Sequence, residues 1–129
     1  MKKPCNPLRS VTLISPAPPY FEALRDRRSP LTRMQRLPRQ GLLALEAVTP
    51  EEWEVNIIDE RIEPILPENI DSPIVGITTM TYMAPRAFDL ARQLKALGKT
   101  VVLGGFFPTL TPELALGVPS VDSIVIGRG

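Results

Sequence analysis

The sequence predicts an α/β domain in which helices cover both faces of a parallel five-stranded sheet, giving three layers. Short segments rich in β-branched residues alternate with helical segments along the chain, which is the order that a parallel sheet requires. Several of the strand segments are apolar throughout, as strands covered on both faces are. The chain has 129 residues, which is enough for a single domain with an ordinary core.

The first half of the chain contains two predicted strands and one helix. The segment SVTLIS (10–15) is a buried strand that the prolines of PAPP stop. Residues 16–38 form a long loop rich in proline and arginine, and loops of that length in compact domains usually have a function. A helix is expected over 40–48, with these residues directed inward: Leu42, Leu43, Leu45 and Ala47 or Val48. The alternating segment WEVNIID (53–59) is the second strand, and a linking segment with one helical turn follows it.

The clearest helix lies between two apolar strands in the second half. PIVGITTM (73–80) is the third strand and TVVLGG (100–105) is the fourth. Between them, 85–98 is helical, because Pro85 suits a first turn and Gly98 suits the end of a helix. The apolar stripe of this helix consists of Ala87, Leu90, Ala91, Leu94 and Leu97.

The chain ends with a short helix and a fifth strand. TPELALG (111–117) is the helix, with Thr111 as its cap, and SIVIG (123–127) is the strand. Right-handed crossovers favour the strand order 2-1-3-4-5. The fold class is therefore flavodoxin-like, also described as Rossmann-like.

The composition excludes several kinds of chemistry. The chain has no histidine and one cysteine, Cys5. A Ser-His-Asp triad, a Cys-His pair, a histidine-ligated metal and an internal disulfide are therefore excluded. The formal net charge of +1 gives no indication of nucleic-acid binding. No stretch is apolar for long enough to span a membrane, and prolines near the start argue against a signal peptide, so a cytoplasmic location is expected.

Basic side chains gather in the long loop. They are Arg25, Arg27, Arg28, Arg33, Arg36 and Arg39. Such a run is usually a solvated surface. The alternative is a contact surface for a partner domain or an anionic group.

A binding site is expected at the carboxyl ends of the strands, where ligands of open parallel sheets bind. The residues there are rich in hydroxyls and glycines, and they suit a large ligand held by backbone amides, hydroxyls and apolar surface better than acid–base catalysis. A flavin phosphate loop, a phospho-receiver aspartate, a G-x-G-x-x-G motif and a P-loop are all absent. Asp59 and Glu60, which end the second strand, are expected to be solvated.

Two segments carry a family resemblance. GITTMTYMAPRAFDLARQLKALGKTVVLGGFFPTLTPELAL and the later VDSIVIGRG resemble the cobalamin-binding domain of cobalamin-dependent radical-SAM enzymes, among them the magnesium-protoporphyrin monomethyl ester oxidative cyclase-like members. The resemblance extends to SVTLISPAPPY, GLLALEAV and VNIIDER. It implies that residues 1–129 are a single cobalamin-binding domain and a fragment of a longer chain. That parent would carry a radical-SAM catalytic domain with a [4Fe–4S] cluster and S-adenosylmethionine, and the fragment alone would have no catalytic activity.

The resemblance also implies which residues contact cobalamin. They are Ser15, Pro16, Thr78, Thr79, Met80, Gly104, Gly105, Phe106, Ile126 and Gly127. A Thr78 or Thr79 hydroxyl would bind the dimethylbenzimidazole nitrogen, and two glycines would let the main chain approach the nucleotide tail. No residue is expected to ligate a metal, so the corrin would be held base-off without a histidine ligand. The alternative is a degenerate scaffold domain that has lost cobalamin and docks on the radical-SAM barrel.

Overall fold

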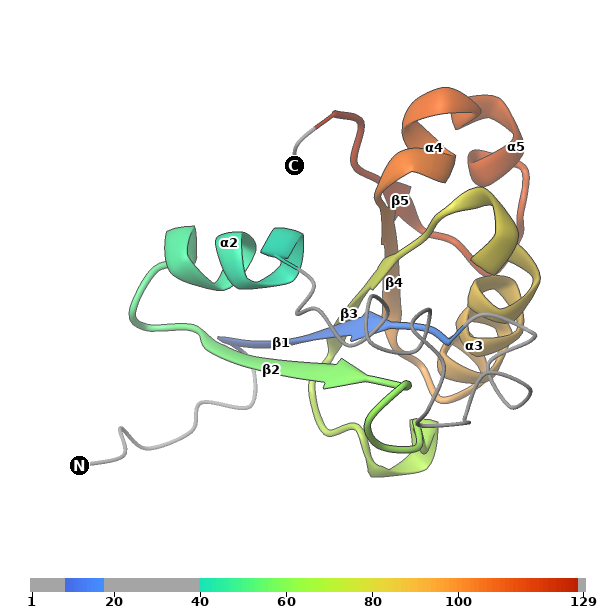
Figure 1. Ribbon diagram of the computed structural model, residues 1–129. Helices are drawn as coiled ribbons and strands as arrows, with labels where there is room; N and C mark the ends of the chain where they lie inside the picture. Colours follow the sequence, from blue (N-terminus) through green and yellow to red (C-terminus); the bar gives the residue numbers. More distant parts are fainter. Residues whose placement is uncertain (1–8, 18–39, 128–129) are drawn as a thin grey trace, which may run out of the picture.

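The computed structural model describes residues 9–17 and 40–127, which form one sheet with helices around it (Figure 1). The strands are β1 (Ser10–Ser15), β2 (Glu54–Asp59), β3 (Ile74–Thr78), β4 (Thr100–Gly104) and β5 (Ser123–Ile124). The helices are α2 (Gln40–Val48), α3 (Ala84–Ala96), α4 (Phe106–Leu110) and α5 (Pro112–Leu116), and the 3₁₀ turns are η2 (Pro67–Asn69) and η3 (Thr81–Met83). Nearly all of the predicted loop 16–38, with its arginines, lies outside the described residues.

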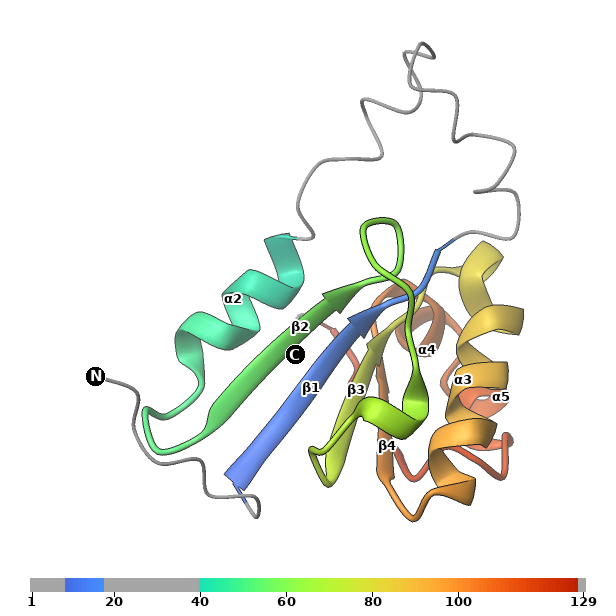
Figure 2. The same cartoon turned by 90° about the horizontal axis from the view of Figure 1, so that it is seen from below.

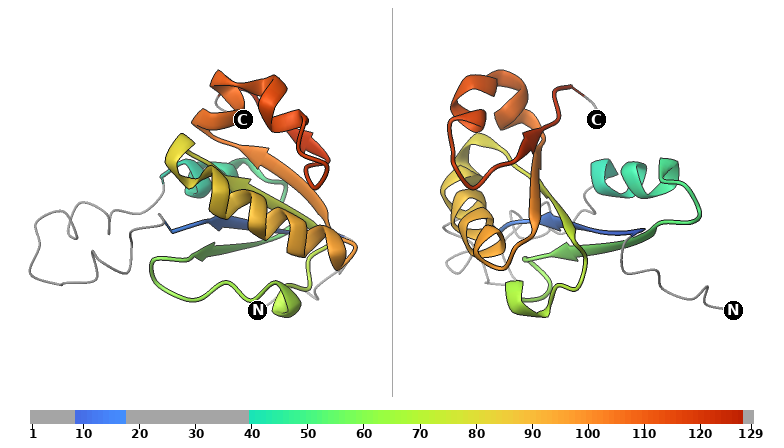
Figure 3. Two further views of the ribbon diagram at one scale, coloured as in Figure 1. Left: turned by 90° about the vertical axis from the view of Figure 1, so that its right-hand side faces the viewer. Right: turned by 180° about the vertical axis from the view of Figure 1, so that it is seen from behind.

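The strands are parallel and lie in the order β2-β1-β3-β4-β5. Figure 2 shows the first four of them side by side. This confirms the predicted flavodoxin-like sheet. Right-handed crossovers place the helix after β1 on one face and the helices after β3 and β4 on the other. In agreement with this, α2 and α3 lie on opposite sides of the sheet (Figure 3).

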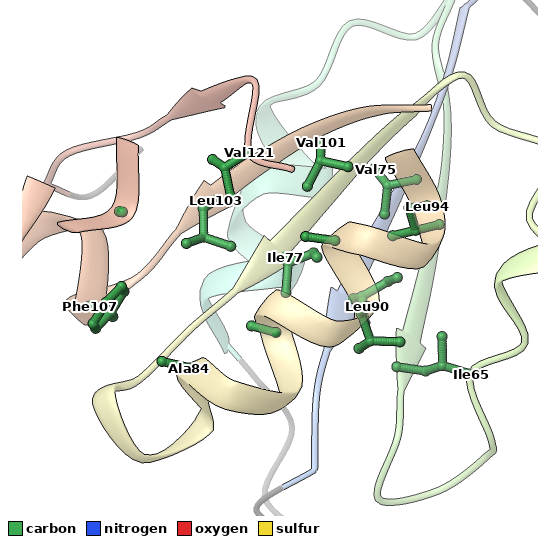
Figure 4. Packing of buried hydrophobic residues seen from close by; sticks show 14 of the residues in the cluster. Ile65, Val75, Ile77, Ala84, Leu90, Leu94, Val101, Leu103, Phe107 and Val121 are labelled. Atoms are coloured by element: carbon green, nitrogen blue, oxygen red, sulfur yellow. The ribbon is translucent and has the colours of Figure 1, made fainter. Parts of the chain in front are cut away.

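The face of the sheet that meets α3, here called the α3 face, holds the core. Its strand residues are Ile14, Val75, Ile77, Val101 and Leu103, each at most 1% exposed. The helix residues against them are Ala87, Leu90, Ala91 and Leu94, all fully buried. Figure 4 shows Leu90 and Leu94 of this helix among the buried side chains of the strands. Leu97 was predicted in the same stripe, but it is 50% exposed. The prediction is wrong because α3 ends at Ala96, and Gly98 then turns the chain with a φ of 79°.

The opposite face, here called the α2 face, is less completely covered. Its residues include Leu13, Gly76, Thr78, Val102 and Gly104, which alternate with the core positions. Apart from Leu13, all of these are only half-buried.

Only one of the apolar residues expected to face inward from α2 is buried. Leu42 is 4% exposed and Leu45 is half-buried, whereas Ala47 is exposed, Leu43 is 47% exposed and Val48 is 76% exposed. The prediction is wrong for Leu43 and for both Ala47 and Val48, because the apolar residues of this helix surround its axis and only one side meets the sheet.

The chain after β4 differs most from the prediction. Gly105 has a φ of 96°, and the chain then enters α4, a helix that the sequence did not predict. The Thr111 hydroxyl donates to the Phe107 carbonyl oxygen over 2.8 Å, at the end of α4, so it does not cap α5. The strand β5 contains only Ser123 and Ile124 of the predicted segment 123–127.

Candidate functional site

The carboxyl ends of the strands meet at one edge of the sheet, and three of the predicted site residues form a row there. Thr78 and Gly104 are register partners on β3 and β4. Ser15 follows the register pair Ile14–Ile77, so it extends the row onto β1. All three lie on the α2 face, because they alternate with core residues of the α3 face. We call Ser15, Thr78 and Gly104 the edge row.

The two glycines of the predicted site have different surroundings. A Cβ on Gly104 would meet no other atom within 4 Å. A Cβ on Gly105 would lie 2.8 Å from the Thr79 carbonyl oxygen and 2.9 Å from the Thr79 nitrogen. Gly105 also has a φ of 96°, which L-residues rarely adopt. Gly105 is therefore required by local packing, whereas Gly104 leaves space above the sheet.

The two threonines also differ. Thr78 is half-buried in the edge row. Thr79 is completely buried, and its main chain joins the two strand ends: its N–H donates to the Gly104 carbonyl oxygen over 2.8 Å, and its carbonyl accepts the Phe107 N–H over 3.0 Å. Met80 follows in the loop and is half-buried, with its sulfur 3.7 Å from the Tyr82 hydroxyl.

A buried hydroxyl lies at the β1 end of the edge row. Ser15 and Pro16 are both fully buried. Within the described part of the chain, the Ser15 Oγ has no hydrogen-bond partner, and the same holds for the Thr79 Oγ1. An unpaired buried hydroxyl costs about 1–3 kcal/mol. Ser15 therefore leaves an unsatisfied hydrogen-bonding group at the β1 end of the edge row.

The acidic residues at the end of β2 are held in ion pairs, so the expectation that they are solvated is wrong. The Arg61 guanidinium binds Asp59, and both side chains are mostly buried. The Arg86 guanidinium binds Glu60 at 2.6 Å, and Glu60 also accepts the Ala17 N–H over 2.7 Å. The hydrogen bond to Glu60 raises the pKa of Arg86 above its ordinary value. Glu60 therefore connects the ends of β1 and β2 to α3, whereas Asp59 is paired within the turn that follows β2.

The remaining predicted site residues are Phe106, which begins α4, and Ile126 and Gly127, which follow β5. Phe106 is 63% exposed and Ile126 is 60% exposed. The Gly127 N–H donates to the Thr109 hydroxyl over 3.1 Å, which holds the end of the described chain against α4. The segments 78–84 and 104–110 contain no charged residue. The edge therefore presents hydroxyls, main chain and apolar side chains to a ligand.

Comparison with known proteins identifies the family. The model of the B12 binding domain matches residues 31–129. The chain belongs to the B12-binding domain family. This confirms the resemblance to a cobalamin-binding domain.

Relatives of this B12-binding domain are methyltransferases. Bacteriochlorophyllide d C-8(2)-methyltransferase of Chlorobaculum tepidum is 36% identical over 68% of the chain, and bacteriochlorophyllide d C-12(1)-methyltransferase of the same organism is 33% identical over 63%. An uncharacterized methyltransferase of Synechocystis sp. is 26% identical over 95% of the chain. The chain spans about a fifth of the length of these relatives. No solved structure matches it.

The edge row fits a corrinoid with an aromatic tail. Such a tail needs a flat surface without protruding side chains and a few hydrogen-bonding groups at its rim. Gly104 provides a surface without a protruding side chain, and the Ser15 and Thr78 hydroxyls provide the hydrogen-bonding groups. Among residues 9–17 and 40–127, no three His, Cys, Asp or Glu side chains gather as around a metal ion. In that same part of the B12-binding domain, no helix is long and apolar enough to cross a membrane.

Sequence reasoning missed two residues of the α2 face that lie next to the edge row. Gly76 and Leu13 are register partners one step farther from the edge. The signal for Gly76 was present, because an isolated glycine within a strand often marks a close approach of another group. Leu13 carries no such signal, since it is an ordinary apolar residue of a strand.

Proposed function

We propose that this domain binds cobalamin with the nucleotide tail against the α2 face and the edge row. The observation that carries the proposal is the pairing of an open glycine position, Gly104, with the buried and unpaired Ser15 hydroxyl. Membership of the B12-binding domain family supports it. Of the two threonines, Thr78 lies on the α2 face and would donate to the base nitrogen.

The chain's own residues bind and orient the cofactor. When bound, cobalamin supplies the cobalt–carbon bond chemistry of methyl transfer. Ser15 and Thr78 would hold the tail by hydrogen bonds. Phe106, at the start of α4, and Met80, in the loop after β3, would contact the corrin. The absence of histidine from the chain supports a base-off corrin without an imidazole ligand from this domain.

The domain is proposed to work within a longer radical-SAM enzyme. The relatives' names support methyl transfer, and their lengths leave room for a catalytic domain in the same polypeptide. That domain would hold the [4Fe–4S] cluster and S-adenosylmethionine, because this chain has one cysteine and a cluster needs several. On this proposal the fragment is a cofactor carrier and not an enzyme by itself.

A docking scaffold without cobalamin is the second candidate, and one observation favours it. Large apolar side chains are exposed on α4, α5 and the segment after β5. They are Phe106, Leu110, Leu114, Leu116, Val125 and Ile126. Exposed apolar surface of this kind often marks a protein contact. The cofactor test below distinguishes the two candidates.

The test is retention of the cofactor by the purified chain. The chain is mixed with hydroxocobalamin and desalted, and its visible spectrum is recorded. We expect retained corrin with a base-off spectrum. A colourless protein after desalting would favour the scaffold.

A substitution in the edge row tests whether the nucleotide tail of cobalamin binds there. Gly104→Val places a side chain in the open position and is expected to lower the affinity for cobalamin about tenfold or more. Gly41→Val is the matched control, because Gly41 lies in α2 and a Cβ there also meets nothing within 4 Å. Thermal unfolding of both variants checks that the fold is kept. If Gly104→Val binds cobalamin as the unchanged chain does, the tail does not lie on the edge row.

A further inference from the structure

The second row of the α2 face differs in chemistry from the edge row. Leu13, Gly76 and Val102 are register partners across β1, β3 and β4, one step farther from the carboxyl edge. The edge row carries two hydroxyls, Ser15 and Thr78, whereas this second row has only aliphatic side chains and a glycine. A ligand that enters from the edge therefore meets hydroxyls first and then an apolar row.

Leu13 fills the space that Gly76 leaves. The Leu13 Cδ2 lies 2.9 Å from the position that a Cβ of Gly76 would take. Leu13 is only 8% exposed, so its side chain is packed in this place. Above Gly104, by contrast, no atom lies within 4 Å of the same position. The open space over the sheet therefore ends where the Leu13 side chain begins.

We propose that Leu13 sets the depth of the tail site and selects the lower base of the corrinoid. This inference rests on the proposed function. A base with one hydrogen-bonding edge and an otherwise apolar body, such as dimethylbenzimidazole, would bond to the edge row and place its methyl groups against Leu13 and Val102. Adenine has polar atoms around its whole rim. It would bury some of them against the second row without partners, which costs about 1–3 kcal/mol for each group.

The first test needs no variant. Equilibrium affinities of the unchanged chain are measured for cobalamin, for the corrinoid that carries adenine as its lower base, and for cobinamide, which has no base. We expect cobalamin to bind about tenfold or more tightly than the adenine corrinoid. Equal affinities for these two would overturn the role of Leu13. Failure to bind any of the three would instead overturn the proposed function.

The second test moves a hydroxyl into the second row. Leu13→Thr shortens the side chain and gives the deeper part of the base a hydrogen-bonding partner. The preference for cobalamin over the adenine corrinoid is expected to fall about tenfold, while the affinity for cobinamide stays the same. Val11→Thr is the matched control, because Val11 lies on the same strand and face one row deeper. An unchanged preference in Leu13→Thr, with cobinamide still bound, would overturn the inference.

Discussion

The two faces of β3 show how one strand can serve both stability and binding. Val75 and Ile77 point to the α3 face and are at most 1% exposed. Ile74, Gly76 and Thr78 alternate with them, point to the α2 face and are half-buried. Since neighbouring residues of a strand point to opposite faces, the core and the candidate site are separated by one residue along the chain. The difference indicates that the fold is stabilised mainly by the α3 face, which leaves the α2 face available to a ligand.

The largest expected effect compares two isoleucines of β3. Ile77→Ala removes a side chain that is 1% exposed in the core of the α3 face, and it is expected to lower the free energy of unfolding by about 2–5 kcal/mol. Ile74→Ala makes the same change on the half-buried α2 face and is expected to cost less than about half as much. Urea denaturation followed by circular dichroism measures both. Equal losses would show that the two faces contribute alike to stability.

A smaller effect is expected at the two glycines after β4. Gly105→Ala places a Cβ within 2.9 Å of the Thr79 main chain at a φ of 96°, and it is expected to lower the free energy of unfolding by about 1–3 kcal/mol. Gly104→Ala adds a Cβ where nothing lies within 4 Å, so its effect on stability should stay within about 0.5 kcal/mol.

Measuring the affinity for cobalamin distinguishes the roles of these two glycines further. If the edge row holds the tail, Gly104→Ala should weaken cobalamin binding although it leaves stability unchanged. Gly105→Ala should weaken binding only as far as it unfolds the protein. Thermal unfolding without ligand checks the effect of Gly104→Ala on stability. A clear loss of stability would contradict the claim that Gly104 serves binding and not packing.

The fold was predictable because its signals are local. Apolar β-branched runs gave the strands, and helices between three of the four successive pairs of parallel strands leave few possible orders. The helix α4 was not predictable, because Phe106, Phe107 and Pro108 carry no helical periodicity. Its position depends on the hydrogen bond from the Phe107 N–H to Thr79, a contact between two loops. The same limit applies to Leu43 and Val48, whose exposure depends on the side of α2 that meets the sheet.

The candidate site was predictable only as a set of strand ends. Thr78 and Thr79 are neighbours in the sequence, and so are Gly104 and Gly105. Only the register between β3 and β4 shows that Thr78 and Gly104 share a face. The sequence also could not show that Glu60 is paired with Arg86, because these residues are brought together by the fold of distant segments.

The smallest expected effect lies at the other end of the sheet. Asp122 accepts the Val101 N–H over 2.8 Å and forms an ion pair with Lys95 of α3. The hydrogen bond from Lys95 is the main reason that the pKa of Asp122 lies below its ordinary value of 3.8. A carboxyl group whose pKa is lowered by folding stabilises the native state above its unfolded pKa. This stabilisation is lost as the pH falls through the folded pKa.

Asp122→Asn tests this contribution, because the amide oxygen can still accept the Val101 N–H while the charge is removed. The variant should be slightly less stable than the unchanged chain at neutral pH. The difference should shrink as the pH falls below about 4, the unfolded pKa, and through the lower pKa of the native carboxylate. Asp71→Asn, at an exposed aspartate, is the control for the loss of one negative charge. A difference that stays constant from neutral pH to about pH 2 would mean that the charge of Asp122 does not hold α3 to the start of β4.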